Sequence, residues 1–258
     1  MSQFISVFDM LKIGVGPSSS HTLGPWRATQ QWIQKLQENA LFENITHIHV
    51  DLYGSLSLTG KGHATDLAVL LGLSGTDPEY IPIDSIDTTI STIKTTNKLQ
   101  FNGTKEIPYS ENTVVFNRDF LPFHSNGMTF IGYQNETIIS KETYYSIGGG
   151  FVIQESTEAP AENEFTKKNF PYPINRATQL EKYCETENKL ISEIVYQNEL
   201  ELKSAKEIDT ELRRIWDTML ECMYTGCHTD GILPGGLNVK RRALTMHNKL
   251  IKNANYTN

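Results

Sequence analysis

Two short segments of this chain combine residue types that handle protons and bind anions. The first runs from Pro17 to Thr22 and places three serines, a histidine and a threonine in succession. The second runs from Tyr53 to His63 and combines three glycines and several hydroxyl side chains with a lysine and a histidine. Because the pKa of free histidine lies nearest neutrality, His21 and His63 are a candidate acid and base. The two segments predict acid–base chemistry on a small anionic molecule.

Hydrophobic spacing predicts the elements that flank these segments. Apolar residues recur at helical intervals over 23–40, which predicts a helix with one buried face. Three hydroxyl residues could cap this helix: Ser19, Ser20 and Thr22. Alternation of apolar and polar residues over 45–53 predicts a strand that leads into the second segment. A helical run over 61–73 then places His63 in a first helical turn.

Each segment also has a plain structural interpretation. A serine-rich loop often caps a helix, and a histidine within it can be incidental. The second segment superficially resembles a phosphate-binding loop, but the spacing from Gly54 to Gly60 is one residue too long, and Gly62 replaces the hydroxyl that holds magnesium. A nucleotide site is therefore excluded. What remains is a glycine-bounded turn in which Asp66 follows His63 by three residues and could orient its imidazole.

Three other histidines give weaker signals. His47 and His49 would project from the same face of the 45–53 strand and could bind a metal, but no third ligand is evident. His124 lies in a polar loop with Asn126, which makes this loop a possible second ligand site. Taken alone, it is a loop histidine.

The three cysteines do not form a disulfide framework and are expected to be reduced: Cys184, Cys222 and Cys227. The spacing of the last two could suit an iron–sulfur or zinc site. However, Cys222 falls in the apolar stripe of an expected helix, where a small buried thiol is the commoner explanation.

The rest of the chain changes from strand-like to helical. Strands are expected over 113–120, 128–133 and 137–145. A polar, proline-containing stretch over 154–175 is the candidate linker. Helices are expected over 176–186 and 190–202, and a third begins at the capping pair Ser204 and Glu207. The predicted class is α+β: an N-terminal α+β domain followed by an all-helical region with a small, incomplete core.

Composition excludes several classes of partner. The 258 residues carry a formal charge of -7, so no basic field favours nucleic acid. The N-terminus lacks the pattern of a secretion signal, and no apolar run approaches the ~20 residues that span a bilayer. We therefore expect a cytoplasmic protein that binds neither nucleic acid nor membrane.

Longer motifs around these segments resemble a known family. The motifs are SVFDMLKIGVGPSSSHTLGP, DLYGSLSLTGKGHATD, LPFHSNGM, TYYSIGGGFV, NELELKSAKEID and DGILPGGL with the pair Arg241 and Arg242. Together they resemble the bacterial iron–sulfur L-serine dehydratases, also called L-serine ammonia-lyases, of the single-chain type. The resemblance extends over nearly the whole chain, and the first two motifs are long enough to be highly specific.

The resemblance implies a domain plan and a reaction. It implies a serine dehydratase beta domain over 1–155, similar to a substrate-binding regulatory domain of some phosphoglycerate dehydrogenases. A linker over 156–175 and the N-terminal part of the helical alpha domain over 176–258 would follow. The implied reaction is β-elimination from L-serine, which gives pyruvate and ammonia through an unstable enamine. In this family an exposed iron of a four-iron, four-sulfur cluster is the Lewis acid for the departing hydroxyl.

The resemblance also implies roles for individual residues. His63 and His21 would be the catalytic base and its helper, with His63 favoured as the base. The implied substrate-binding residues are Ser18, Ser19, Ser20, Thr22 and Lys61. His124 and Asn126 would line an allosteric serine site.

One departure from the family concerns the cofactor. The family's cluster cysteines lie in the second half of the helical domain, and none of the three cysteines here matches them, so the sequence looks truncated. We expect this polypeptide alone to hold no cluster and to act as a homo-oligomer or with a complementary chain that carries it. Two alternatives stay open. One is a non-catalytic module that binds a small amino acid. The other is a pyridoxal-phosphate dehydratase, although no lysine in this sequence lies in a context that supports it.

Overall fold

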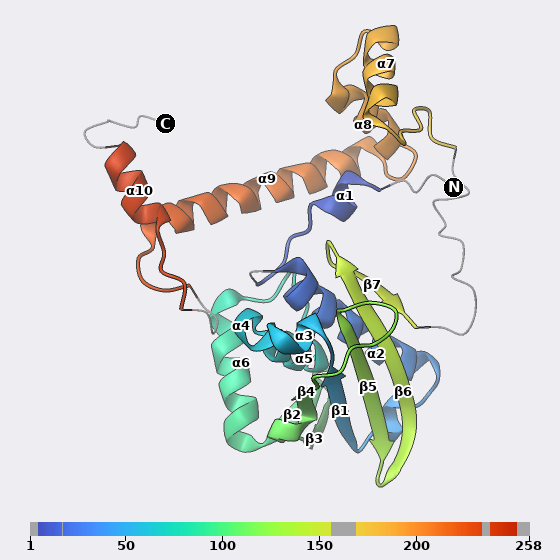
Figure 1. Ribbon diagram of the computed structural model, residues 1–258, viewed down its shortest axis with the longest axis vertical. Helices are drawn as coiled ribbons and strands as arrows, with labels where there is room; N and C mark the ends of the chain where they lie inside the picture. The colour runs from blue at the N-terminus through green and yellow to red at the C-terminus, as the bar shows by residue number, and fades with distance from the viewer. Residues whose placement is uncertain (1–4, 17, 156–168, 234–237, 252–258) are drawn as a thin grey trace. The chain divides into compact units, whose positions relative to one another are not determined.

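The computed structural model describes residues 5–16, 18–155, 169–233 and 238–251 (Figure 1). Pro17, most of the expected linker and residues 234–237 lie outside this set. The chain forms two compact units. The α+β unit comprises Ile13–Glu155 and Asp230–Arg241, and the helical unit comprises Met1–Lys12, Ser156–Thr229 and Arg242–Asn258. The predicted α+β class is confirmed.

Five strands of the α+β unit form one mixed sheet in the order β4-β1-β5-β6-β7 (Figure 1). The strands are β1 (His47–Leu52), β4 (Val114–Phe116), β5 (Gly127–Gln134), β6 (Thr137–Gly148) and β7 (Phe151–Gln154). β1 pairs with β4 in parallel, and the other pairs are antiparallel. The strands expected over 45–53, 128–133 and 137–145 are confirmed. Of the strand expected over 113–120 only Val114–Phe116 is a strand, and β7 was not expected. A short turn joins β5 and β6. Asn135 in that turn adopts a positive φ of 53°.

Helix α2 (Gly24–Glu38) covers one face of this sheet. It packs against β5, β6 and β7, and also against α5 (Thr65–Leu73). Trp32 of α2 is fully buried, stacks on Phe130 at 5.3 Å between ring centroids, and donates from Nε1 to Ser140 Oγ at 3.1 Å. The helix expected over 23–40 is thereby confirmed, and it supports the segment that carries His21.

The two segments singled out in the sequence adopt short helical turns that differ from expectation. Ser19–Leu23 form a π-helical turn, η1, that continues directly into α2, and no side-chain hydrogen bond caps either element. The expected capping by Ser19, Ser20 or Thr22 is therefore wrong. The second segment forms α3 (Ser55–Leu58) and α4 (Gly60–His63) rather than a loop.

Ala64 separates His63 from the helix that it was expected to open. Ala64 adopts a left-handed conformation with φ 57°, which ends α4 at His63 and lets α5 begin at Thr65. Asp66 thus lies in the first turn of a different helix, and no described hydrogen bond joins it to His63. The expected orientation of His63 by Asp66 is wrong.

Several elements of the α+β unit lie where no element was expected. They are η2 (Phe42–Asn44), α6 (Ile83–Thr96), the hairpin of β2 (Lys98–Phe101) with β3 (Lys105–Pro108), and η3 (Glu111–Thr113). In α6, only Ile90 and Ile93 are buried, and many of the other residues are threonine or serine. Isoleucines at positions 83, 86, 90 and 93 do have helical spacing, so the sequence signal for this helix was present and was missed.

The helical unit contains α1 (Val7–Met10), α7 (Ala177–Glu187), α8 (Ile191–Glu199), α9 (Ala205–His228) and α10 (Ala243–Leu250). The three helices predicted after the linker are confirmed as α7, α8 and α9. The capping box is present, since Ser204 Oγ accepts from Glu207 N at 3.4 Å and Ser204 N donates to Glu207 Oε2 at 2.8 Å. The short α1 and α10 were not expected.

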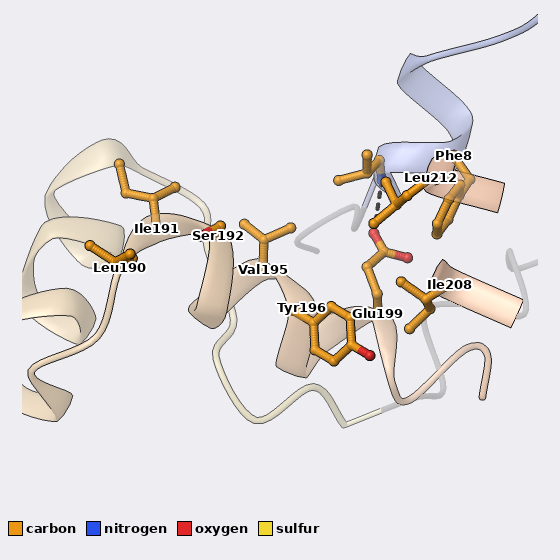
Figure 2. Close-up of a pocket in the computed structure, with 10 residues that line it drawn as sticks. Phe8, Leu190, Ile191, Ser192, Val195, Tyr196, Glu199, Ile208 and Leu212 are labelled. Atoms are coloured by element: carbon orange, nitrogen blue, oxygen red, sulfur yellow. Dashed lines mark hydrogen bonds between the residues drawn. The ribbon is translucent and has the colours of Figure 1, made fainter. Parts of the chain in front are cut away.

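A buried carboxylate holds the N-terminal segment to the helical unit. Glu199 at the end of α8 is 2% exposed and accepts hydrogen bonds from Ser6 Oγ and Val7 N, both at 2.8 Å. Figure 2 shows Glu199 and the hydrogen bond that its carboxylate accepts from the backbone of the α1 segment. It borders an otherwise largely apolar hollow of about 690 Å³. The hollow is lined by Val7, Phe8, Leu190, Ile191, Ser192, Val195, Tyr196, Glu199, Ile208 and Leu212.

The long helix α9 presents much of its apolar stripe to solvent. Ile208 is buried, whereas the stripe beyond it is exposed: Leu212, Trp216, Met219, Leu220, Met223 and Tyr224. Cys222 is also exposed, so its expected burial is wrong. None of the described helices combines the length and apolarity needed to cross a bilayer.

Candidate active site

The structure brings His21 and His63 into direct contact within the α+β unit. Their ring centroids lie 4.9 Å apart, and the ring planes are inclined by 38°. His21 comes from the π-helical turn η1, and His63 is the last residue of α4. Both side chains are half-buried. Segments about forty residues apart in the sequence therefore supply two adjacent imidazoles.

Hydroxyl groups hold both ring nitrogens of His21. Nδ1 lies 2.9 Å from Ser20 Oγ, and Nε2 lies 3.0 Å from Ser55 Oγ. Ser20 Oγ lies 3.3 Å from Ser18 Oγ, which extends the row by one more hydroxyl. Because a hydroxyl can donate or accept, this row is compatible with either neutral tautomer of His21. It can also carry a proton along its length.

His63 is held at one nitrogen only. Its Nδ1 lies 2.9 Å from the carbonyl oxygen of Thr59. A carbonyl can only accept, so Nδ1 carries the proton in the neutral ring, and the lone pair resides on Nε2. No hydrogen bond to that Nε2 is present among the described residues. Of the four ring nitrogens in the pair, this one is best placed to take a proton from a ligand.

The surroundings of His21 favour its neutral form. Burial lowers its pKa from the usual value of about 6.5, and the nearby His63 lowers it further. A smaller contribution from the contact with Ser55 raises this pKa. Since two adjacent imidazoles repel each other when both are charged, the pair disfavours a second proton.

A buried threonine connects the two histidine segments. Thr65 Oγ1 donates to the carbonyl oxygen of His21 at 2.7 Å, and Thr65 is fully buried. Thr65 follows His63 by two residues, beyond the left-handed Ala64. The backbone of η1 is therefore fastened to the start of α5, which helps to fix the spacing between the rings.

The other residues with expected substrate contacts lie in different settings. Thr22 is buried, and its hydroxyl donates to the Ser18 carbonyl. Ser19 is exposed. Lys61 places its ammonium 5.7 Å from the ring centroid of Phe116, and no described contact joins it to either histidine. Ser18 and Ser20 are thus the members of the set that the structure joins to the histidine pair.

The loop expected to hold an allosteric site is closed by its own hydrogen bonds. His124 Nδ1 accepts from Asn126 N at 3.1 Å, and Asn126 Nδ2 donates to the carbonyl oxygen of Ser146 at 3.0 Å. Asn126 is buried, and His124 is half-buried. These bonds give both residues a role in the loop, and their part in regulation stays a prediction.

The remaining histidine pair has ordinary partners. The ring of His47 stacks on Tyr133 with 4.3 Å between ring centroids. His49 Nε2 lies 3.1 Å from Asp51 Oδ1. Within the described part of the chain, no group of three or more histidine, cysteine, aspartate or glutamate side chains could hold a metal ion.

The three cysteines do not fit a four-iron cluster. Cys184 lies on α7, whereas Cys222 and Cys227 lie on α9. The last two are five residues apart, which places them about 140° apart around a helix of 3.6 residues per turn. Such a cluster requires several thiolates converging on one point, and these side chains do not converge.

The sequence interpretation missed three residues that position the pair: Ser55, Thr59 and Thr65. All three lie inside the second motif, but the sequence does not show which hydroxyl or carbonyl would face an imidazole. Gly54, with φ 54°, was the available clue, because a left-handed glycine marks a sharp turn immediately before Ser55.

Comparison with known proteins matches both halves of the chain. Residues 6–157 match the family model of the serine dehydratase beta chain, and residues 186–257 match that of the serine dehydratase alpha chain. An L-serine dehydratase of Haemophilus influenzae is 43% identical over 257 residues, and L-serine dehydratase 1 of Escherichia coli is 41% identical over 256. An L-serine dehydratase of Streptomyces coelicolor is 39% identical over 249 residues.

These alignments cover nearly all of this chain but not of its relatives. They include 98%, 98% and 95% of the present chain, and 56%, 56% and 55% of the three relatives in the same order. The chain thus spans about half the length of the curated relatives it matches. With the beta-chain family model matching more than half of its residues, the chain belongs to the serine dehydratase family.

Proposed function

We propose that this chain supplies the proton-handling site of an L-serine dehydratase, which converts L-serine to pyruvate and ammonia. The observation that carries the proposal is the contact between His21 and His63, whose ring centroids lie 4.9 Å apart. The names of the relatives support the choice of L-serine. We further propose a cytoplasmic protein that acts as a homo-oligomer or with a complementary chain.

The reaction requires a base at the α-carbon of the substrate. Nε2 of His63 is the proposed base, because its lone pair has no described protein partner while Nδ1–H is bound to the Thr59 carbonyl. That carbonyl also stabilises the imidazolium that forms when the α-proton is taken. Loss of this proton and of the β-hydroxyl, together one water, leaves an enamine. The enamine tautomerises and is hydrolysed to pyruvate and ammonia.

His21 is the proposed helper. Its lowered pKa keeps the ring neutral, so that it carries one N–H and one lone pair beside the base. A neutral neighbour lets His63 accept a proton without placing two positive charges 4.9 Å apart. The hydroxyls of Ser18 and Ser20 continue the row from His21 Nδ1 and are proposed substrate contacts.

The family resemblance implies an iron–sulfur cluster, which would supply a Lewis acid for the hydroxyl. Because Cys184, Cys222 and Cys227 do not converge, we propose that such a cluster takes its ligands from other cysteines. Anoxic reconstitution of this chain followed by iron and sulfide analysis should therefore find no stoichiometric cluster. A stoichiometric cluster would contradict this part of the proposal.

Turnover tests the proposed chemistry. Protein reconstituted anoxically, together with any complementary chain that co-purifies, is assayed for L-serine-dependent pyruvate. We expect His63→Asn to lower the rate by about 10²-fold or more, the usual contribution of a general base. His47→Asn is the matched control, since His47 lies on β1 and contacts Tyr133 instead. Equal, measurable rates for both variants in the cluster-loaded assembly would contradict the assignment. Saturable L-serine binding by that cluster-loaded assembly without pyruvate would favour the non-catalytic module.

A further inference from the structure

We infer that Ser55 is a positioning residue that sets the tautomer of His21 and connects this histidine to the loop that carries His124. The hydroxyl of Ser55 lies 3.0 Å from His21 Nε2. The backbone amide of Ser55 donates to the carbonyl oxygen of Ser125 at 2.8 Å. One residue therefore contacts the proposed active site with its side chain and the 121–126 loop with its backbone.

The backbone of Ser55 is held from both sides. The amide of Gly54 donates to the Asp119 carbonyl at 2.9 Å. A Cβ on Gly54 would lie 2.3 Å from the Ser125 carbonyl oxygen, so only glycine allows the loop to approach this closely. The Ser55 carbonyl accepts from Thr59 N at 3.1 Å and from Thr59 Oγ1 at 3.0 Å.

The proposed arrangement gives the hydrogen bonds at His21 a direction. His21 Nε2 is the only hydrogen-bond partner of the Ser55 hydroxyl among the described residues. In the proposed arrangement the Ser55 hydroxyl donates to that nitrogen. Nδ1 of the neutral ring then carries the proton and donates to Ser20 Oγ, which can donate onward to Ser18 Oγ. Ser55 thus occupies the lone pair of His21, while the lone pair of His63 stays free for the substrate.

Thr59 contacts both Ser55 and His63. Its amide and hydroxyl bind the Ser55 carbonyl, and its own carbonyl accepts from His63 Nδ1. The α3 turn therefore orients both imidazoles through one hydroxyl and one carbonyl. A shift of the loop at Ser125 would be transmitted first to Ser55 and then to His21.

Nitrogen NMR of the chain labelled with ¹⁵N-histidine tests the inference without any substrate. In the wild-type protein, His21 and His63 should both be protonated at Nδ1. In Ser55→Ala, the ratio of the two His21 tautomers should shift about fivefold toward the Nε2-protonated form, the effect expected from losing one ordinary hydrogen bond. Ser55→Thr keeps the hydroxyl and should restore the wild-type pattern.

Ser57→Ala is the matched control, because Ser57 lies in the same four-residue turn and makes no side-chain hydrogen bond with the described residues. It should leave the His21 signals unchanged. Wild-type His21 signals in Ser55→Ala, or an equal shift in Ser57→Ala, would overturn the positioning role. So would a wild-type His21 ring protonated at Nε2.

The inference rests on the proposed function only for its consequence in catalysis. In the pyruvate assay, Ser55→Ala should lower kcat more than it changes KM, and Ser55→Thr should recover the rate. The expected NMR shift, with no pyruvate formed by the cluster-loaded assembly of any variant, wild type included, would support the positioning of His21 and contradict the proposed function. Turnover that is unchanged in Ser55→Ala would contradict a part for Ser55 in catalysis.

Discussion

Replacing Glu199 by glutamine tests how the N-terminal segment is held to the helical unit. The carboxylate of Glu199 accepts from Ser6 Oγ and Val7 N, both at 2.8 Å, and Glu199 and Ser6 are 2% and 4% exposed. A glutamine side chain is neutral and offers one oxygen instead of two, so one donor loses its acceptor and the other keeps only an uncharged one. Hydrogen bonds to charged groups contribute about 1.5–3 kcal/mol. We expect the free energy of local opening at α1 to fall by this amount.

Hydrogen exchange at the Val7 amide measures this change directly. Because about 1.4 kcal/mol corresponds to a factor of ten, exchange should be roughly tenfold to a hundredfold faster in Glu199→Gln. Glu181→Gln on α7 removes the same charge from an exposed position and should leave Val7 unaffected. Unchanged exchange in Glu199→Gln, or equal acceleration in both variants, would refute the anchoring role of Glu199.

Three further perturbations probe the α+β unit by urea denaturation. Gly24→Ala would place a Cβ 2.0 Å from Ser146 Oγ and should lower the free energy of unfolding by about 1–3 kcal/mol; an unchanged midpoint would contradict this packing. Thr65→Val should lower the free energy of unfolding by about 1 kcal/mol. Thr65→Ser should lower it less, because serine keeps the hydrogen bond to the His21 carbonyl. Equal losses in the two variants would argue against that bond. Since the pKa of folded His21 lies below its usual value, the unfolded chain binds more protons below about pH 6.5, and the free energy of unfolding should fall as pH drops through that window. His21→Gln should flatten this dependence, and identical slopes would exclude His21 as its source.

Regular periodicity predicted the elements that support the site. The alternation of Ile48, Val50 and Leu52 with polar residues defined β1, because this strand has one buried and one half-exposed face. The apolar spacing of α2 defined a helix that buries Trp32 against the sheet. In both elements one face is buried, and such a face leaves its period in the sequence.

Irregular backbone at the site could not be predicted in the same way. The break at Ala64 depends on a left-handed residue that is not glycine, and sequence propensity does not favour that conformation. Without the break, His63 was assigned to the start of a helix and paired with Asp66. The partner of His21 was missed for a similar reason, since Ser55 reaches it only through the turn at Gly54.

The sequence identified the histidine pair but not the contacts of the residues around it. The motifs singled out His21 and His63, and the structure places their rings together. The sequence could not show that Lys61 lies over Phe116 or that the hydroxyl of Thr22 is used by the Ser18 carbonyl. Such contacts depend on side-chain directions that are set by packing, not by spacing along the chain.

The central claim is that His21 and His63 together contact the substrate, and titration of the labelled chain with L-serine tests it most directly. The ring Cε1–H resonances of His21 and His63 should move together along one saturation curve, while those of His47 on β1 stay in place. Saturable binding of L-serine that leaves both rings unmoved, or that moves His124 alone, would contradict the claim.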